Sequence, residues 1–425
     1  MTESFNHIEK VKGELNLSGD KSISHRAVIF SSMAKGKSVI KNISTGEDVL
    51  STINCFKNLG IEIENSNKEL IINGKGYKGF TNPTQNLNAG NSGTTARLLT
   101  GLLCAQNFDS TIIGDESLSK RPMDRIIIPL QKMGAKIKSQ NNFLPLNIYH
   151  SPQLNNISYE LPVASAQVKS SIILAGLHCE DITSVVEKIP SRNHTETMLG
   201  LDVKRGESGN TILVSKKNYP VASEYFIPSD ISSAAFFIVL ALINKDSSLR
   251  IKNVSLNETR KGFLNLLEEM GAKINYENIS VSSGEVYGDV IVESSALKNI
   301  NIPGKIIPNI IDEIPALSVA GLFAEGDFII RNASELRKKE SDRINSLCYN
   351  YKKLGLDVEE FDDGFKISGE IRNKEVVFES FNDHRIAMAF GILALLLKEG
   401  GKVNNFVCVN ISNPDFINQV KQITG

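Results

Sequence analysis

The sequence predicts an α/β protein of two domains, each built from three copies of one unit, with helices inside and sheets outside (an inside-out α/β barrel). A strand-like run, a polar turn and an apolar helix recur six times along the 425 residues. A second pattern, a helix ending in a hydrophobic residue and glycine before an alternating strand, keeps the same phase. The chain is also longer than a usual single-core protein, which favours two domains.

The six polar turns mark where the apolar helices are expected to begin. The turns are Lys21-Ser22, Asn91-Ser92-Gly93-Thr94-Thr95, Ser165-Ala166-Gln167, Ser229-Asp230-Ile231-Ser232-Ser233, Asp312-Glu313 and Asp383-His384-Arg385. Five helix ends carry the second pattern, and a sixth copy near the C-terminus has lost it. They are Leu59-Gly60, Met133-Gly134, Leu199-Gly200, Met270-Gly271 and Leu354-Gly355.

A unit of roughly 70 residues is too small to bury all its faces alone, so three units are expected to share a core. The segments 172–177 and 387–393 are apolar nearly all round, which is typical of interior helices. The polar break 244–248 predicts the boundary between the halves. We therefore expect one domain over residues 20–243, and a second over 1–19 plus 244–425.

Composition indicates a soluble globular protein, with 41% hydrophobic and 22% charged residues. A net charge of −1 argues against a nucleic-acid binder that works by bulk electrostatics. No apolar run is long enough for a membrane span, and the N-terminus lacks a signal pattern. The five cysteines are scattered without C-x-x-C spacing, and the six histidines show no metal-binding spacing. We expect a cytoplasmic protein without metal or cofactor.

The segment 74–79 matches the glycine pattern of dinucleotide-binding turns. The following Phe80-Thr81-Asn82-Pro83 cannot open a helix, so a glycine-rich turn between strands is the better interpretation.

The stretch 19–26 predicts an anion site at a helix start. Apolar residues from Ile23 to Ala34 recur on one helix face, and Gly36 is placed to end that helix. Lys21 and Ser22 then lie at the helix N-terminus, with Arg26 one turn later. A phosphate or carboxylate would suit this arrangement. The alternative is an ordinary cap with solvated basic residues.

Other unit starts combine small or hydroxyl residues with basic residues, and in isolation each could be a capping run or a solvated charge pair. Together they exceed what capping requires, and they predict an inter-domain cleft for a ligand set with several negative charges. Two carboxylates among them, Asp312 and Glu340, are acid–base candidates whose pKa values the neighbouring basic groups are expected to lower. The basic residues of this cleft are Lys21, Arg26, Arg121, Lys339, Arg343 and Arg385.

Seven motifs, in family order over nearly the whole chain, resemble the 5-enolpyruvylshikimate-3-phosphate synthase (3-phosphoshikimate 1-carboxyvinyltransferase) family. The resemblance implies two domains, each of three βαβαββ units. It also implies transfer of the enolpyruvyl group of phosphoenolpyruvate to the 5-hydroxyl of 3-phosphoshikimate, with release of phosphate, by addition and elimination through a tetrahedral intermediate. This is a step of the shikimate pathway towards chorismate and aromatic amino acids. The motifs are residues 19–26, 90–97, 120–123, 165–170, 191–196, 336–343 and 382–388.

The resemblance also implies roles for individual residues. Asp312 resembles the base that faces the 5-hydroxyl, Glu340 the proton donor and acceptor at the methylene carbon, and Lys21 a catalytic residue that touches both substrates. The implied 3-phosphoshikimate contacts are Lys21, Ser22, Arg26, Ser165, Gln167, Ser191, Arg192, Asp312 and Lys339. The implied phosphoenolpyruvate contacts are Lys21, Gly93, Arg121, Gln167, Arg343 and Arg385. The implied partners are these two substrates, bound by a monomer with no nucleic acid and no membrane.

The chain departs from the family pattern at Ile411, three residues before Pro414, where some members have lysine. Two alternatives stay open at this point. A UDP-N-acetylglucosamine enolpyruvyl transferase usually has Lys-Asn in place of Lys21-Ser22, and a cysteine in the loop that is here 117–121. A non-catalytic anion-binding relative would have lost an acid–base residue, yet Asp312 and Glu340 are present.

Overall fold

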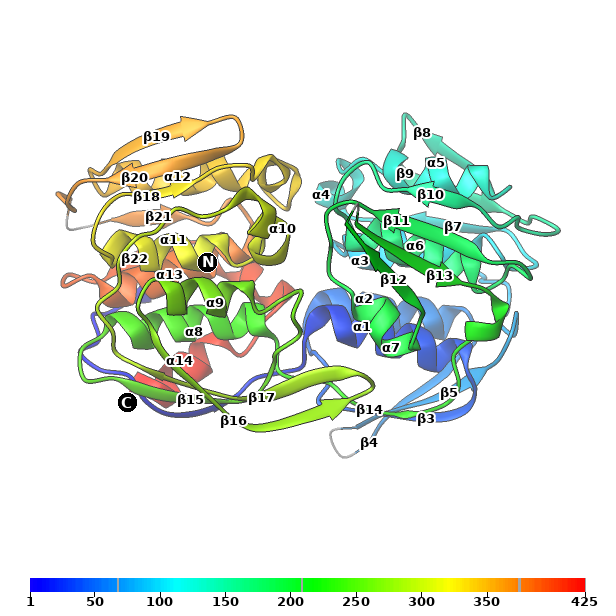
Figure 1. Cartoon of the computed structure of the whole chain (residues 1–425), viewed down its shortest axis with the longest axis horizontal. Helices are drawn as coiled ribbons and strands as arrows, with labels where there is room; N and C mark the ends of the chain where they lie inside the picture. Colours follow the sequence, from blue (N-terminus) through cyan, green and yellow to red (C-terminus); the bar gives the residue numbers. More distant parts are fainter. Residues whose placement is uncertain (67–68, 208, 374–375, 425) are drawn as a thin grey trace. The chain divides into compact units, whose positions relative to one another are not determined.

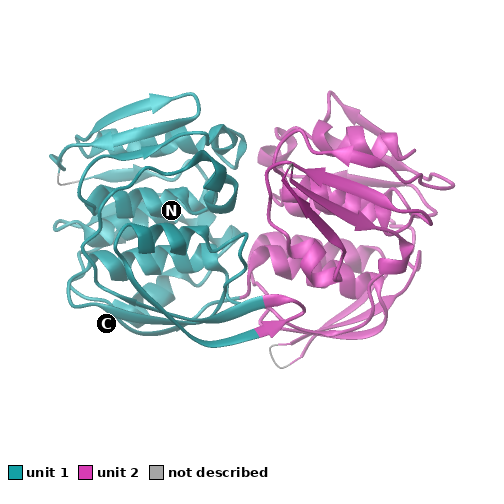
Figure 2. Cartoon of the chain, in the orientation of Figure 1, with its two compact units in different colours: residues 1–18, 228–280, 286–425 teal, residues 19–227, 281–285 magenta. Residues whose placement is uncertain are grey.

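The computed structural model describes residues 1–66, 69–207, 209–373 and 376–424, and it forms two compact units (Figure 2). Unit 1 comprises Met1–Ser18, Pro228–Ser280 and Val286–Gly425, and unit 2 comprises Gly19–Ile227 and Val281–Glu285. The units divide at Ile227 and Pro228, whereas the sequence-based boundary lies after residue 243. The intervening helix α8 (Ile231–Ile243) has its apolar residues in the unit 1 core.

Unit 2 surrounds three buried helices with three sheets of identical topology (Figure 1). Each sheet has one parallel pair, followed by two antiparallel pairings. The helices are α1 (Lys21–Met33), α3 (Gly93–Leu103) and α6 (Ala166–Gly176). The sheets are β14 (Glu224–Phe226), β3 (Lys35–Lys41), β5 (Glu69–Lys75), β4 (Glu62–Ser66); β6 (Leu87–Asn88), β7 (Ser110–Ile113), β9 (Phe143–Tyr149), β8 (Lys136–Gln140); and β10 (Ser158–Glu160), β11 (Thr183–Glu187), β13 (Gly209–Val214), β12 (Val203–Gly206).

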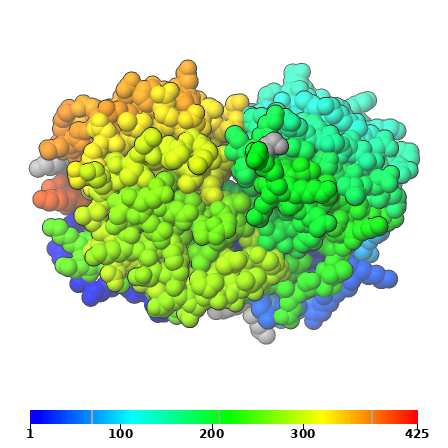
Figure 3. Space-filling model, viewed as in Figure 1, coloured from blue at the N-terminus to red at the C-terminus, as the bar shows by residue number. Residues whose placement is uncertain are grey.

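Unit 1 also packs three sheets around three core helices, α8, α11 (Ile314–Phe323) and α13 (His384–Leu396), but among the described residues two of its sheets have only three strands. In the space-filling view, yellow-green, yellow and orange segments make up much of the visible surface of unit 1 (Figure 3). The sheets are β16 (Lys273–Ser282), β17 (Glu285–Glu293), β15 (Ser248–Ser255), β2 (Lys12–Asn16); β18 (Phe328–Ile330), β20 (Gly364–Ser368), β19 (Asp357–Phe361); and β1 (Glu3–Phe5), β22 (Gly401–Asn404), β21 (Val377–Glu379).

The predicted fold class is confirmed: both units place apolar helices inside and sheets outside. The five predicted glycine stops are also confirmed, since each has a positive φ, between 59° and 103°, where a side chain is strained. They end α2 (Glu47–Asn58), α5 (Asp124–Lys132), α7 (His194–Leu199), α9 (Gly262–Glu269) and α12 (Arg343–Lys353). The remaining helices are α4 (Glu116–Ser119), α10 (Ile307–Ile310), α14 (Phe416–Thr424) and the 3₁₀ turns η1 (Lys216–Asn218), η2 (Gly304–Ile306), η3 (Ser334–Lys338) and η4 (Phe406–Ile411).

All six predicted turns open a core helix. In five of the six, a side chain at the cap position accepts a hydrogen bond from a first-turn N–H, which satisfies an otherwise unpaired donor. The capping residues are Asp20, Ser92, Ser165, Asp230 and Asp383. The sixth helix, α11, begins after Glu313, whose side chain makes no capping hydrogen bond.

Gly36 does not end α1, which stops at Met33; Gly36 instead lies in β3 with φ +109°. The segment 74–79 is confirmed as the end of a strand and a turn. Across the described ranges, no single helix is long and apolar enough to cross a membrane, and one bent pair passes on length and composition only.

Candidate functional site

A cluster of charged side chains in unit 1 surrounds the start of α11. Arg343 opens α12 and donates hydrogen bonds from Nη1 to Asp312 Oδ1 (3.1 Å), from Nη2 to Glu340 Oε2 (2.6 Å) and from Nε to Asp383 Oδ2 (2.8 Å). Lys339 Nζ lies 3.4 Å from Asp312 Oδ1. Arg385 donates from Nη1 to the Asp312 carbonyl at 3.0 Å. The five predicted unit 1 residues therefore lie together, joined by Asp383.

The electrostatics of this cluster favour the charged state of Arg343 and of Asp383. Arg343 is 1% exposed; burial acts to lower its pKa, but the charges of Asp383, Glu340 and Asp312 outweigh burial and raise it. Burial acts to raise the pKa of Asp383, but Arg343 outweighs burial and lowers it. Arg343 thus stays positively charged between the carboxylates of the cluster. A carboxylate beside it can give or take a proton while this positive charge remains in place.

Lys339 and Arg343 do not share a helix, although their spacing would suit one. Residues 334–338 form η3, Lys339 is extended, and α12 begins only at Arg343. The two side chains nevertheless meet at the same oxygen, Asp312 Oδ1. The tertiary structure, rather than a helix face, brings them together.

In unit 2, Lys21 is the first residue of α1, and its ammonium group is paired with a buried carboxylate. Lys21 Nζ lies 2.9 Å from Asp48 Oδ2, and Asp48 belongs to the first turn of α2. Asp48 has no recognisable motif around it, and sequence reasoning missed it. It fixes the position of the Lys21 ammonium at the N-terminal end of α1.

Arg26 is buried within unit 2 and is held by three internal hydrogen bonds. Its Nε donates to Thr195 Oγ1 (2.6 Å), Nη2 to Ser170 Oγ (2.7 Å) and Nη1 to the Ser22 carbonyl (2.8 Å). Burial lowers the pKa of Arg26 to about 10, against the opposing charges of Glu196 and Asp20. Arg26 therefore remains charged at neutral pH while it ties α1 to α6 and α7.

Gly93, Arg121 and Gln167 lie close together, near the starts of α3 and α6. Gln167 accepts from Arg97 Nη1 at Oε1 (2.7 Å) and donates from Nε2 to Thr94 Oγ1 (2.9 Å). A Cβ added at Gly93 would lie 2.7 Å from Arg97 Nη1 and 3.5 Å from Arg121 Nη1. Gly93 thus leaves room for two guanidinium groups. Arg97 was in a predicted motif but was not assigned to the site.

Ser191 and Arg192 follow β11 in a loop that a buried ion cluster anchors. Ser191 donates from both N (3.1 Å) and Oγ (2.8 Å) to Glu187 Oε2. The same oxygen lies 2.9 Å from Lys169 Nζ, which is also 2.6 Å from Glu196 Oε1. The Ser191 hydroxyl thus donates its hydrogen bond to Glu187. Arg192 is half-buried. Ser165 caps α6 through Val168 N.

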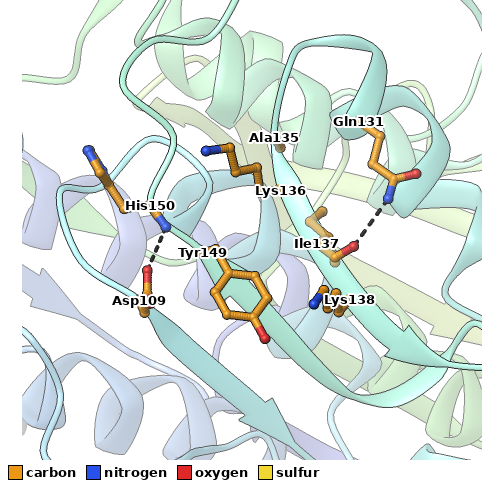
Figure 4. Close-up of a pocket in the computed structure, with 8 residues that line it drawn as sticks. All are labelled: Asp109, Gln131, Ala135, Lys136, Ile137, Lys138, Tyr149 and His150. Atoms are coloured by element: carbon orange, nitrogen blue, oxygen red, sulfur yellow. Dashed lines mark hydrogen bonds between the residues drawn. The ribbon is translucent and has the colours of Figure 1, made fainter.

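A surface pocket of about 550 Å³ lies apart from these residues, along β8 and the end of β9 (Figure 4). Lys136, Lys138 and His150 are among the residues that line it, and Asp109 Oδ1 accepts from the His150 N–H at 2.7 Å. No predicted site residue lines this pocket. We therefore place the candidate site at the charged clusters and not at this pocket.

The comparisons with known proteins agree over nearly the whole chain. The family model for EPSP synthase (3-phosphoshikimate 1-carboxyvinyltransferase) matches residues 5–420. A 3-phosphoshikimate 1-carboxyvinyltransferase of Petrotoga mobilis is 47% identical over 415 residues, covering 96% of each chain. One of Oceanobacillus iheyensis is 45% identical over 416 residues, covering 97% of this chain and 96% of the relative.

Solved structures give the same result. EPSP synthase from Acinetobacter baumannii is 40% identical, with a TM-score of 0.88 over 100% of this chain and 98% of the other. The enolpyruvyl transferase NikO from Streptomyces tendae shares the fold (TM-score 0.78, 99% and 96% covered) at 13% identity. With the family model matched from residue 5 to residue 420, this chain belongs to the EPSP synthase family.

Proposed function

We propose that this protein transfers the enolpyruvyl group of phosphoenolpyruvate to the 5-hydroxyl of 3-phosphoshikimate and releases phosphate. The observation that carries the proposal is the cluster of Asp312, Glu340, Lys339, Arg343 and Arg385, which places two carboxylates among three cations at the start of α11. The named relatives at 45% and 47% identity support the same activity, a step of the shikimate pathway.

The charge of the substrates suits this set of residues. Each substrate carries a phosphate of about −1.5 to −2 and a carboxylate, so binding requires several cations. We assign phosphoenolpyruvate to Lys21, Gly93, Arg121, Gln167, Arg343 and Arg385. We assign 3-phosphoshikimate to Lys21, Ser22, Arg26, Ser165, Gln167, Ser191, Arg192, Asp312 and Lys339. Planar guanidinium groups can bind carboxylate and phosphate oxygens in pairs.

Two carboxylates suffice for the proton transfers. Asp312 accepts the proton of the 5-hydroxyl as the oxygen attacks C2 of phosphoenolpyruvate, while Glu340 gives a proton to the C3 methylene. The tetrahedral intermediate then loses phosphate, which takes up the proton held by Asp312, while Glu340 removes a proton from C3 and the double bond is restored. Lys21, at the positive end of α1, stabilises negative charge on the phosphate groups during both steps.

One of the proposed substrate contacts in unit 2 requires a side-chain rotation. The Ser191 hydroxyl donates its only proton to Glu187, so it can donate to the 3-phosphate only after it turns away from that carboxylate. Arg26 has two guanidinium hydrogens beyond the three used internally, which leaves it able to donate to a ligand as well.

Turnover tests the proposal directly. Purified protein mixed with 3-phosphoshikimate and phosphoenolpyruvate should release inorganic phosphate, and omission of either substrate should abolish release. A parallel reaction with UDP-N-acetylglucosamine in place of 3-phosphoshikimate should give none. No release with 3-phosphoshikimate would overturn the assignment.

We further propose that the protein is a cytoplasmic monomer. Light scattering at micromolar concentration tests the monomer by measuring its mass.

A further inference from the structure

The start of α11 is built differently from the other five core helix starts. Its cap residue, Glu313, is 0% exposed and makes no capping bond. Glu313 Oε1 instead accepts hydrogen bonds from Ser232 Oγ and, at 3.1 Å, from Arg260 Nη2. The other oxygen, Oε2, is buried and has no hydrogen-bond partner among the described residues. The Glu313 carboxylate lies at the cap of α11, but it bonds to the buried Arg260 rather than to the N–H groups of its own helix.

Arg260 joins this carboxylate to a second helix start. Arg260 is 1% exposed, and its Nη2 also donates to Ser232 Oγ, in the first turn of α8. The loop that carries Arg260 is fixed to the segment before α11, because Asn309 accepts from Gly262 N (3.0 Å) and donates to the Glu258 carbonyl (2.9 Å). The turn before α11 is therefore held from two sides, by the buried bonds of Glu313 and by the hydrogen bonds of Asn309.

The residue before Glu313 is Asp312, which faces a different set of partners. Its carboxylate lies against Arg343 and Lys339, and its carbonyl accepts from Arg385. Adjacent carboxylates in one turn are thus each fixed by different cations. Because one peptide unit joins them, a displacement of Glu313 changes the direction of the Asp312 side chain.

We propose that Arg260, acting through Glu313 and Ser232, is a positioning residue that sets the direction of the Asp312 carboxylate towards the substrate hydroxyl. This inference rests on the proposed function, in which Asp312 is the base. A loss of alignment of about 1 Å at a reacting group can lower the rate by as much as about 100-fold, so a buried anchor one residue away affects catalysis. Arg260 is not among the residues assigned to either substrate.

The main test is Glu313→Gln, with Asp289→Asn as the matched control. Asp289, on β17 in the same unit, is also a buried carboxylate paired with an arginine, with Arg250 Nη1 3.0 Å from its Oδ2. Both variants replace a buried carboxylate with an amide and should lower Tm. Only Glu313→Gln should lower kcat, by about 10-fold, with both KM values within about twofold of the wild type.

The pH profile supplies a readout that a purely structural role would not move. In Glu313→Gln, the acid limb of kcat should shift to higher pH, because Asp312 displaced from Arg343 and Lys339 takes up a proton more readily. Asp289→Asn should keep the wild-type profile. If Glu313→Gln does not fold, Ser232→Ala and Arg260→Lys, which remove less of the network, should lower kcat in the same direction by smaller factors.

Each outcome decides the matter. A Glu313→Gln protein with wild-type kcat and a Tm lowered as in the control overturns the inference, as do unchanged kcat values in Ser232→Ala and Arg260→Lys. A wild-type protein that releases no phosphate from the two substrates overturns the proposed function and this inference together. An active wild type with unaffected variants overturns the inference alone.

Discussion

At the scale of single residues, the candidate site depends on a few buried charges that other buried charges hold in place. Arg343 bonds to three carboxylates in unit 1, and Lys21 pairs with Asp48 in unit 2. Buried ion pairs are sensitive to the removal of one partner, because the other charge is then left without compensation. Single substitutions of these charges should therefore show which of them serve binding and which serve stability.

Lys21→Ala should impair the use of both substrates. It removes an ammonium group from the N-terminal end of α1, and a lost hydrogen bond to a charged ligand is worth about 1.5–3 kcal/mol, or about 10–150-fold in affinity. We expect both KM values to rise by at least about 10-fold in steady-state assays. Lys188→Ala, which removes an exposed ion pair with Glu160 in the same unit, should change neither. Wild-type KM values in Lys21→Ala would reject the placement of Lys21.

Asp383→Asn should make stability less dependent on pH. Arg343 holds the pKa of Asp383 below its ordinary value despite burial. A lowered pKa in the folded state gives stability that is complete above the unfolded value of about 3.9 and is lost as pH falls through the folded value. The variant should lose about 3 kcal/mol in urea unfolding at pH 7, and the difference should shrink below about pH 4.

The exposed Asp415→Asn serves as the control for that experiment and should match the wild type at every pH. A difference between Asp383→Asn and the wild type that stays constant from pH 7 to pH 3 would contradict the role given to Arg343.

At the scale of elements, one repeated unit explains both the buried helices and their ends. The helix that ends at Gly200 illustrates this, since Gly200 has φ +59° and a Cβ placed there would meet nothing within 4 Å. The free-energy cost of a side chain at this position therefore comes from backbone strain alone, without a clash.

Gly200→Ala should destabilise the protein by about 1–2 kcal/mol, the cost of a left-handed conformation for a residue with a Cβ. Gly200→Asn should cost less, because asparagine tolerates this conformation better. Chemical unfolding of the two variants measures the difference. Equal losses in both variants would mean that a steric contact, rather than backbone strain, decides the cost.

At the scale of the whole molecule, the residues assigned to each substrate come from both units. The phosphoenolpyruvate set, for example, includes Arg121 of unit 2 and Arg343 of unit 1. A ligand that contacts residues of both units restricts their motion relative to each other, and its binding should favour a closed state.

We therefore expect saturating 3-phosphoshikimate to lower the radius of gyration measured by small-angle X-ray scattering. Inorganic phosphate at the same concentration should have a smaller effect, because it cannot bridge the two sets of residues. An unchanged radius of gyration with bound 3-phosphoshikimate, verified by calorimetry, would contradict closure.

The sequence by itself determined the repeat, the six core helix starts and the cationic motifs. These features follow from local rules: apolar periodicity, capping residues and glycine at positive φ act within a few residues of each other. Asp312, Glu340 and Arg343 were picked out because they lie in charged motifs at or near helix starts, and their roles were implied by the family resemblance.

Only the tertiary structure decided which side chains meet. Asp48 is the partner of Lys21, Glu187 that of Lys169 and Arg260 that of Glu313, and no local pattern marks these pairs. Each contact joins segments that are distant in the sequence or separated by a loop, so packing of the core helices sets the distance. Local sequence fixes where a charged residue stands on its element, but packing fixes which charge it faces.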